Sequence, residues 1–250
     1  MAELVRPIFP TAPAFVVSSV KLSQNPARQT ELQDLLSSAS SGVIAVWAAL
    51  DDSCAISTIC LSTTAVVLVL NDVRSQTKAW RSLLQDTVLC NPDVRLVGLD
   101  MDAIAYGLFL DAKCFTSRGI DVQSLFSPKN RDIQTVMGEL LGATAPGPQA
   151  AVSRLYSNDK QADSSQSLPV ARAYVLARAM SGESQHSKIL SVSDERLLST
   201  RRLTIPVGVL INCVGERLTE LPIMLASQCS REGSSHWPST RFDEARHPAE

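Results

Sequence analysis

Short apolar runs separated by a few turn-forming residues dominate the first part of the chain. Three of them follow one another at residues 43–50, 55–61 and 65–70, and Asp, Ser and Thr predominate between them. Turns this short join antiparallel neighbours, so the pattern predicts a three-strand meander. The runs contain few polar residues, which indicates strands that are buried on both faces.

Apolar residues at helical spacing alternate with further short strands along the rest of the chain. Leu32, Leu35 and Leu36 share one face of a helix that begins near Pro26. A run of strands followed by strand–helix units predicts an α/β fold with a mixed sheet covered by helices. We expect further helices over residues 72–89, 100–110, 130–141 and 169–180, strands over 94–99 and 119–122, an edge strand over 14–20, and loops over 143–149 and 157–168.

The length of 250 residues corresponds to one domain with an appendage. We expect an N-terminal extension at residues 1–13, the folded domain at 14–182 and a C-terminal extension at 183–250. Polar residues after Ser230 predict that this last extension is partly disordered. Its apolar island at residues 203–213 is open to three interpretations: an element packed on the core, a partner-binding segment, or a C-terminus produced by a gene-model error.

Composition removes several classes of function. The net charge of -2 excludes a protein that holds nucleic acid by bulk positive charge, so any such contact needs a local patch. The six cysteines form no CxxC or Cys/His cluster, which argues against a zinc site and favours a reducing interior over secretion. Prolines interrupt the N-terminal apolar stretch, and no run reaches the length of about 18 apolar residues that a membrane span needs. We therefore expect a soluble intracellular protein, cytoplasmic or nuclear, without a membrane partner.

Nucleophile-based enzymes find no support in the sequence. The three histidines are His186, His236 and His247, and none has a serine or cysteine partner at a motif spacing. The chain contains neither a P-loop nor a G-x-G-x-x-G motif.

Several segments, taken in order, resemble the 3′–5′ exonuclease domain of the ribonuclease D type over residues 14–182. "AISTICLS" and "VVLVLNDV" are similar to its second and third strands. "AWRSLLQDTVLCNPDVRLVGLDMDAIAYGLFL" is similar to its helix, Asn-Pro break, fourth strand and following helix, and "GIDVQSLF" and "VMGELLGA" to the next two segments. The resemblance implies a ribonuclease H-like α/β fold: a mixed sheet, in which parallel strands extend the antiparallel meander, flanked by helices.

The chemistry of that family needs four carboxylates around two divalent metals. The resemblance places Trp47 and Ala49 at the two acidic positions of the first core strand. It places Asp102 on the helix after the fourth strand, and Tyr174 and Arg178 in the Y-x-x-x-D frame of the last helix. It therefore carries over only Asp102 and Tyr174 as remnant catalytic positions, while Trp47, Ala49 and Arg178 are degenerate metal-ligand positions.

The replacement of acidic residues by Trp47, Ala49 and Arg178 bears directly on metal binding. An indole and a methyl group offer no oxygen ligand, and Arg178 puts a positive charge where a cation should bind. We expect no cofactor, with Mg²⁺ or Mn²⁺ required only if the domain is active. Two alternatives stay open: Asp100 in place of Asp102, and a shifted register that recruits Asp51–Asp52, although that pair reads as a hairpin turn.

Arginines offer candidate contacts to nucleic acid. Arg154, Arg172 and Arg178 are placed to approach a phosphate in the former cleft, although a solvated helix face explains the last two equally well. Core packing is the structural alternative for Trp47 and Tyr174.

Three functions follow from these observations. The first is a catalytically degenerate exonuclease-like module that binds nucleic acid, RNA rather than DNA, or protein partners as a scaffold in RNA metabolism. The second is an active metal-dependent 3′–5′ exonuclease with a non-standard carboxylate set. The third is a protein-interaction domain without a nucleic-acid role.

Overall fold

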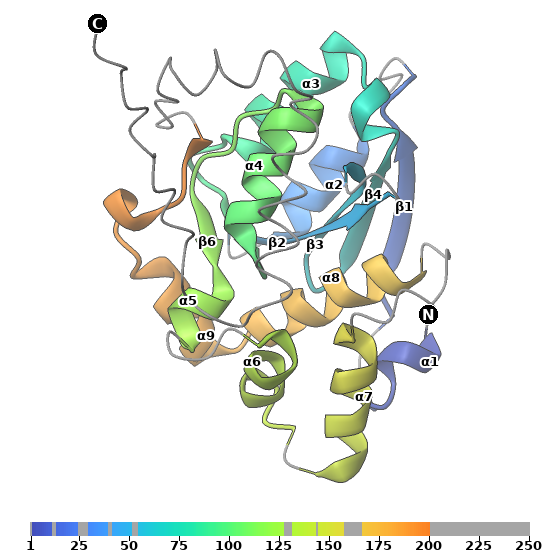
Figure 1. Cartoon of the computed structure of the whole chain (residues 1–250), viewed down its shortest axis with the longest axis vertical. Helices are drawn as coiled ribbons and strands as arrows, with labels where there is room; N and C mark the ends of the chain where they lie inside the picture. The colour runs from blue at the N-terminus through green and yellow to red at the C-terminus, as the bar shows by residue number, and fades with distance from the viewer. Residues whose placement is uncertain are drawn as a thin grey trace, which may run out of the picture.

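The computed structural model describes residues 2–11, 14–24, 30–39, 42–51, 55–127, 132–143, 145–157 and 167–200. A six-stranded sheet forms its centre, in the order β1-β4-β3-β2-β5-β6 (Figure 1). Neighbours β2–β3 and β3–β4 are antiparallel, whereas β1–β4, β2–β5 and β5–β6 are parallel. The predicted mixed sheet, with a meander extended by parallel strands, is confirmed. The strands are β1 Val16–Lys21, β2 Val43–Leu50, β3 Ile56–Ser62, β4 Val66–Asn71, β5 Arg95–Gly98 and β6 Gly119–Asp121.

Helices cover both faces of this sheet (Figure 1). One face packs against α2 Thr30–Ser38, η1 Val73–Ser75, α3 Lys78–Leu84, the π-helical turn η2 Gln85–Leu89 and α4 Met101–Ala112. The other face packs against α1 Ala2–Val5, α5 Val122–Phe126, α6 Ile133–Leu140, α7 Pro146–Tyr156, α8 Ser167–Met180 and α9 Glu183–Leu190. A short 3-10 turn, η3 Asp194–Arg196, follows α9.

Alternation along the strands explains the two cores. In β2, Ile44 and Val46 belong to the core on the α4 side, while Ala45 belongs to the core on the α8 side, where Trp47 packs against it. Successive side chains of a strand point to opposite faces, so an unbroken apolar run fills both cores at once. The prediction of strands buried on both faces is therefore confirmed.

Three segments differ from the predicted helices and loops. Residues 143–149 were expected to form a loop, but α7 begins at Pro146 because proline is tolerated in the first helical turn, where its missing N–H has no partner to lose. The single helix expected over residues 72–89 is three pieces, since Asp72 adopts a left-handed φ of 58° and Thr77 caps a new helix by accepting from Trp80 N. The helix expected over 130–141 begins at Ile133, where the Asp132 side chain caps it.

The described part of the C-terminal extension packs on the sheet. The Arg95 guanidinium donates to the carbonyls of Ile189 at 2.7 Å and Val192 at 2.8 Å, and Leu198 forms a bridge with Gly119 of β6. The boundary near residue 182 stays a prediction. The apolar island at 203–213 and the tail after Ser230 lie outside the described residues.

Within the described residues, no helix is both long enough and apolar enough to cross a membrane. Cys60 and Cys114 are buried free thiols and Cys90 is a half-buried one, so the two buried thiols act as small apolar side chains of the core. Cys54, Cys213 and Cys229 lie outside the described residues.

Candidate functional site

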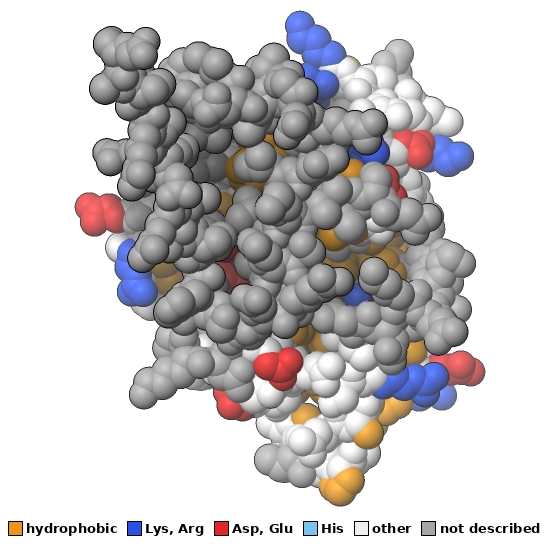
Figure 2. Space-filling view, in the orientation of Figure 1, with side chains coloured by type: hydrophobic (Ala, Val, Ile, Leu, Met, Phe, Trp, Pro, Cys, Tyr) orange, Lys and Arg blue, Asp and Glu red, His pale blue; other side chains and the backbone are white. Residues whose placement is uncertain are grey.

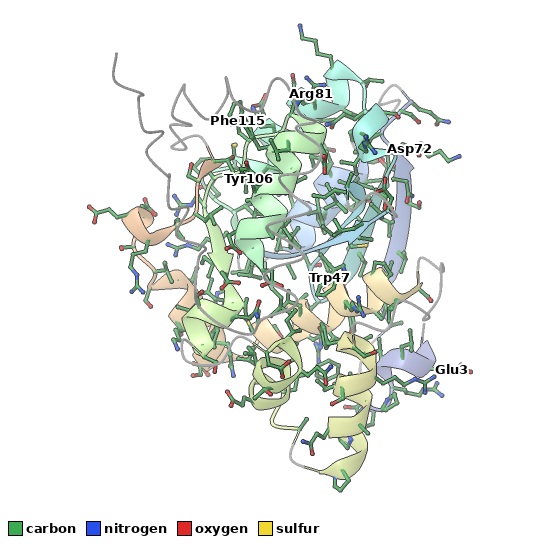
Figure 3. The ribbon with its side chains drawn as sticks, viewed as in Figure 1. Glu3, Trp47, Asp72, Arg81, Tyr106 and Phe115 are labelled. Carbon is green, nitrogen blue, oxygen red and sulfur yellow. The ribbon has the colours of Figure 1, made fainter. Side chains whose placement is uncertain are left out.

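The helix α8 lies across the sheet and makes its most extensive contact with β2 (Figure 1). Within this contact, Arg172 of α8 lies beside Trp47 of β2. Trp47 projects from β2 into this space, at the level of α8 in Figure 3. The contact between β2 and α8 is the place at which the resemblance predicts a metal-binding cleft.

Trp47 is enclosed by an arginine and a tyrosine from two different helices. The Arg172 guanidinium carbon lies 5.0 Å from the centroid of the Trp47 ring. The Tyr156 ring, at the end of α7, lies 5.8 Å from the Trp47 ring at an interplanar angle of 59°. We call Trp47, Tyr156 and Arg172 the plug, because together they fill the space between β2, α7 and α8.

Hydrogen bonds fix Arg172 within the plug. Its Nε donates to the carbonyl of Leu155 at 2.6 Å, and its Nη2 donates to the carbonyl of Ser157 at 2.9 Å. Tyr156 in turn donates its hydroxyl to the carbonyl of Arg172 at 3.1 Å. These carbonyls end α7, so Arg172 acts as a cationic cap on that helix.

Burial shifts the pKa of both polar members of the plug. The pKa of Arg172 is lowered because burial disfavours its charge. The pKa of Tyr156 is raised because burial disfavours the phenolate, although the Arg172 charge opposes this shift. The tyrosine is thus a neutral hydrogen-bond donor rather than a base, and no step of general base catalysis is open to it at neutral pH.

The N-terminal segment covers the next two turns of α8. The Phe15 ring stacks on Tyr174, with centroids 3.8 Å apart and an interplanar angle of 18°. The Arg178 guanidinium carbon lies 5.6 Å from the centroid of the Phe9 ring. Tyr174 is fully buried, which raises its pKa, while the nearby Arg178 acts in the opposite direction. Among the described residues, the buried Nε of Arg178 has no hydrogen-bond partner.

Acidic residues near the start of α4 lie at helix ends or take part in local hydrogen bonds. Asp102 is exposed in the first turn of α4, where a negative charge is favoured by the helix dipole. Asp100, with a left-handed φ of 53°, donates its backbone N–H to Oε1 of buried Gln123 at 2.8 Å. The Asp121 carboxylate accepts from Met101 N at 3.4 Å and from Ser124 N at 2.9 Å, so it joins the starts of α4 and α5. Asp121 and Gln123 thus connect the segment after β6 to the start of α4.

The remaining candidates lie apart from the plug. Asp51 directly follows β2. Its Oδ1 accepts from Ala55 N at 3.1 Å and its Oδ2 pairs with Arg74 at 3.4 Å, which fits a residue of the hairpin turn. Asp52 lies outside the described residues. Arg154 is exposed on α7 and lines a shallow pocket between that helix and α1.

Comparison with known proteins finds no family profile and no curated protein that matches this sequence. The solved structures that resemble this chain include exonuclease domains and an RNase D. The Nibbler EXO domain of Aedes aegypti is 14% identical with a TM-score of 0.45, and the match covers 72% of this chain and 91% of that one. RNase D of Trypanosoma brucei in complex with RNA is 14% identical with a TM-score of 0.42, covering 72% and 66% of the two chains. The EXD2 exonuclease domain soaked in Mn and GMP is 17% identical with a TM-score of 0.38, covering 71% and 93%.

The plug fills the contact between β2 and α8 with side chains that carry no carboxylate. Among the described residues, no group of three or more His, Cys, Asp and Glu side chains is arranged to hold a metal ion. The groups that meet between β2 and α8 are an indole, a phenol and a guanidinium. They can pack and donate hydrogen bonds, but they supply no anionic oxygen to a divalent cation.

Proposed function

We propose that this chain is a non-catalytic module with a 3′–5′ exonuclease-like fold. The observation that carries the proposal is the plug, in which Arg172 lies 5.0 Å from the Trp47 ring where β2 meets α8. Mg²⁺ and Mn²⁺ favour oxygen ligands, and the positions of Trp47, Ala49 and Arg178 offer none. Asp102 and Tyr174 are then remnants of a site rather than catalytic residues.

Two positively charged side chains of α8 oppose the binding of a metal ion. Arg172 is bound by two carbonyl oxygens, so its charge stays at the site. A divalent cation placed nearby would meet this charge in surroundings of low dielectric constant, where like charges repel strongly. Arg178, one turn and a half further along α8, adds a second positive charge on the same helix.

The partner class that we propose is RNA in preference to DNA, with protein partners in RNA metabolism, inside the cell. Of the three arginine candidates, Arg154 is the exposed one, whereas Arg172 and Arg178 are half-buried. On the face drawn in Figure 2, the visible Lys and Arg side chains of the described residues are scattered rather than gathered into one patch. We therefore expect weak RNA binding that involves few phosphates.

Two titrations test the proposal on the full chain. Calorimetry with Mn²⁺ should give no binding heat up to millimolar concentrations, because a single exposed carboxylate holds the ion no better than solvent does. Saturable Mn²⁺ binding that Asp102→Ala abolishes would contradict the non-catalytic assignment and favour the active alternative.

An RNA titration separates binding from a pure protein-interaction role. Fluorescence anisotropy with a single-stranded RNA should show binding that weakens with salt, with a log–log slope of about −0.7 for each phosphate neutralised. Arg154→Ala should reduce that slope, and Arg6→Ala, at another exposed arginine, is the matched control. No binding even at low salt would remove the RNA part of the proposal.

A further inference from the structure

The strand β1 forms an edge of the sheet (Figure 1). Val16 N donates to the carbonyl of Ala65 at 2.9 Å, and Leu22 N donates to the carbonyl of Asn71 at 3.0 Å. Because main-chain groups in a strand alternate in direction, the even-numbered residues of β1 face β4, and the N–H and C=O groups of Val17, Ser19 and Lys21 face outward. Within the described part of the chain, β4 is the one strand paired with β1.

This edge also carries exposed apolar side chains. Val16 is 62% exposed and Val17 is 42% exposed, which sets them apart from the buried valines of β4. The opposite edge, β6, is different, because the backbone of Leu198 forms a bridge with Gly119 and so occupies part of that edge. An open edge with apolar side chains is a template for another strand, and only Lys21 at one end opposes such pairing.

We propose that β1 pairs antiparallel with β1 of a second copy of this chain, so that the two six-stranded sheets join across a two-fold axis. In the register that we assign, Ser18 faces Ser18 of the second copy, Val17 faces Ser19, and Val16 faces Val20. The outward-facing groups of Val17 and Ser19 then exchange main-chain hydrogen bonds. The most exposed valine meets another valine twice, a pairing that stabilises antiparallel strands.

Self-complementarity favours a second copy over an unrelated partner. A two-fold axis through Ser18 opposes each patch to itself, as an isologous interface requires. Lys21 falls opposite Phe15 of the second copy, so no like charges face each other across the strands. The dimer needs neither metal nor RNA and does not depend on the function proposed above.

The expected interface is small. A strand of six residues is about 20 Å long. Its pairing buries less than the ~800 Å² per partner of a standard interface, so we expect a weak dimer. Such a dimer forms and dissociates with concentration.

Sedimentation velocity on the full chain over a concentration series tests the dimer. The sedimentation coefficient should rise with concentration, and Val16→Lys should weaken association at least about tenfold, because it adds a charge to each copy of the edge. Leu190→Lys, at another exposed apolar residue (46%) on α9, is the matched control and should associate like the wild type. A monomer at all concentrations, or equal weakening by both variants, would overturn the proposal.

Cross-linking tests the register. In a non-hydrogen-bonded antiparallel pair the Cα atoms lie about 4.5 Å apart, which suits a disulfide. Ser18→Cys should therefore cross-link under mild oxidation, whereas two Lys21→Cys residues would lie about 20 Å apart along the strands and should not. The wild type, oxidised in parallel, accounts for the native cysteines. Equal cross-linking of the two variants would overturn the register.

Discussion

Replacing Arg172 by alanine removes the side chain that joins β2, α7 and α8. The variant loses hydrogen bonds to the carbonyls of Leu155 and Ser157, at 2.6 and 2.9 Å, and the contact with the Trp47 ring at 5.0 Å. If Arg172 is a structural residue, its loss should lower the free energy of unfolding and should leave RNA binding nearly unchanged.

The magnitude follows from these contacts. Two hydrogen bonds from a charged donor contribute about 1.5 kcal/mol each, and a partly desolvated cation–π contact contributes about 1 kcal/mol. The burial that lowers the pKa of Arg172 opposes them, so the net loss should be about 2–4 kcal/mol. For a domain of this size, each kcal/mol corresponds to a fall of about 2–4 °C in Tm.

Urea unfolding followed by circular dichroism measures the loss. Arg154→Ala is the matched control, because this arginine is exposed on α7 and its removal should change stability by no more than about 0.5 kcal/mol. An Arg172→Ala variant of unchanged stability that has lost RNA binding would refute the reasoning, since Arg172 would then be a phosphate ligand.

Three further predictions concern other positions. Burial raises the pKa of Cys60 from 9.0 to about 12. Between these pH values the folded protein keeps a thiol proton that the unfolded chain loses, so the free energy of unfolding should fall as pH rises. Urea midpoints measured at about pH 8 and pH 10 check this prediction. Gly42 has φ +66°, and a Cβ there would lie 2.7 Å from the carbonyl oxygen of Asp93, so Gly42→Ala should cost about 1–3 kcal/mol in thermal or urea unfolding. Asp102→Asn should lower stability by no more than about 1 kcal/mol, because only a helix-dipole interaction is lost.

The sheet could be predicted from sequence because the apolar pattern of each strand depends on which of its faces are buried. The apolar runs of β2, β3 and β4 carry no alternation, and that pattern is typical of strands covered on both faces. The helix α7 was missed because Pro146, Gly147 and Pro148 read as loop residues. Its stability comes from burial of Val152, Leu155 and Tyr156 against the core, which local propensity does not report.

The site was only partly accessible to sequence reasoning. The resemblance singled out Trp47, and Arg172 was named only as a candidate phosphate contact. Their contact with each other depends on where α7 ends, and that end lay beside residues expected to form a loop. Tyr156 was not a candidate, because its proximity to Trp47 arises from packing between distant segments. The stacking of Phe15 on Tyr174 likewise joins residues that no local spacing relates.

The length of a 5′-labelled single-stranded RNA, followed over time in the presence of Mg²⁺ or Mn²⁺, tests the central claim most directly. The plug predicts that, with either metal, the purified full chain shortens this RNA no more than a protein-free blank does. Metal-dependent shortening of the RNA from its 3′ end, abolished by Asp102→Ala, would show that the domain is a working exonuclease and would contradict the account.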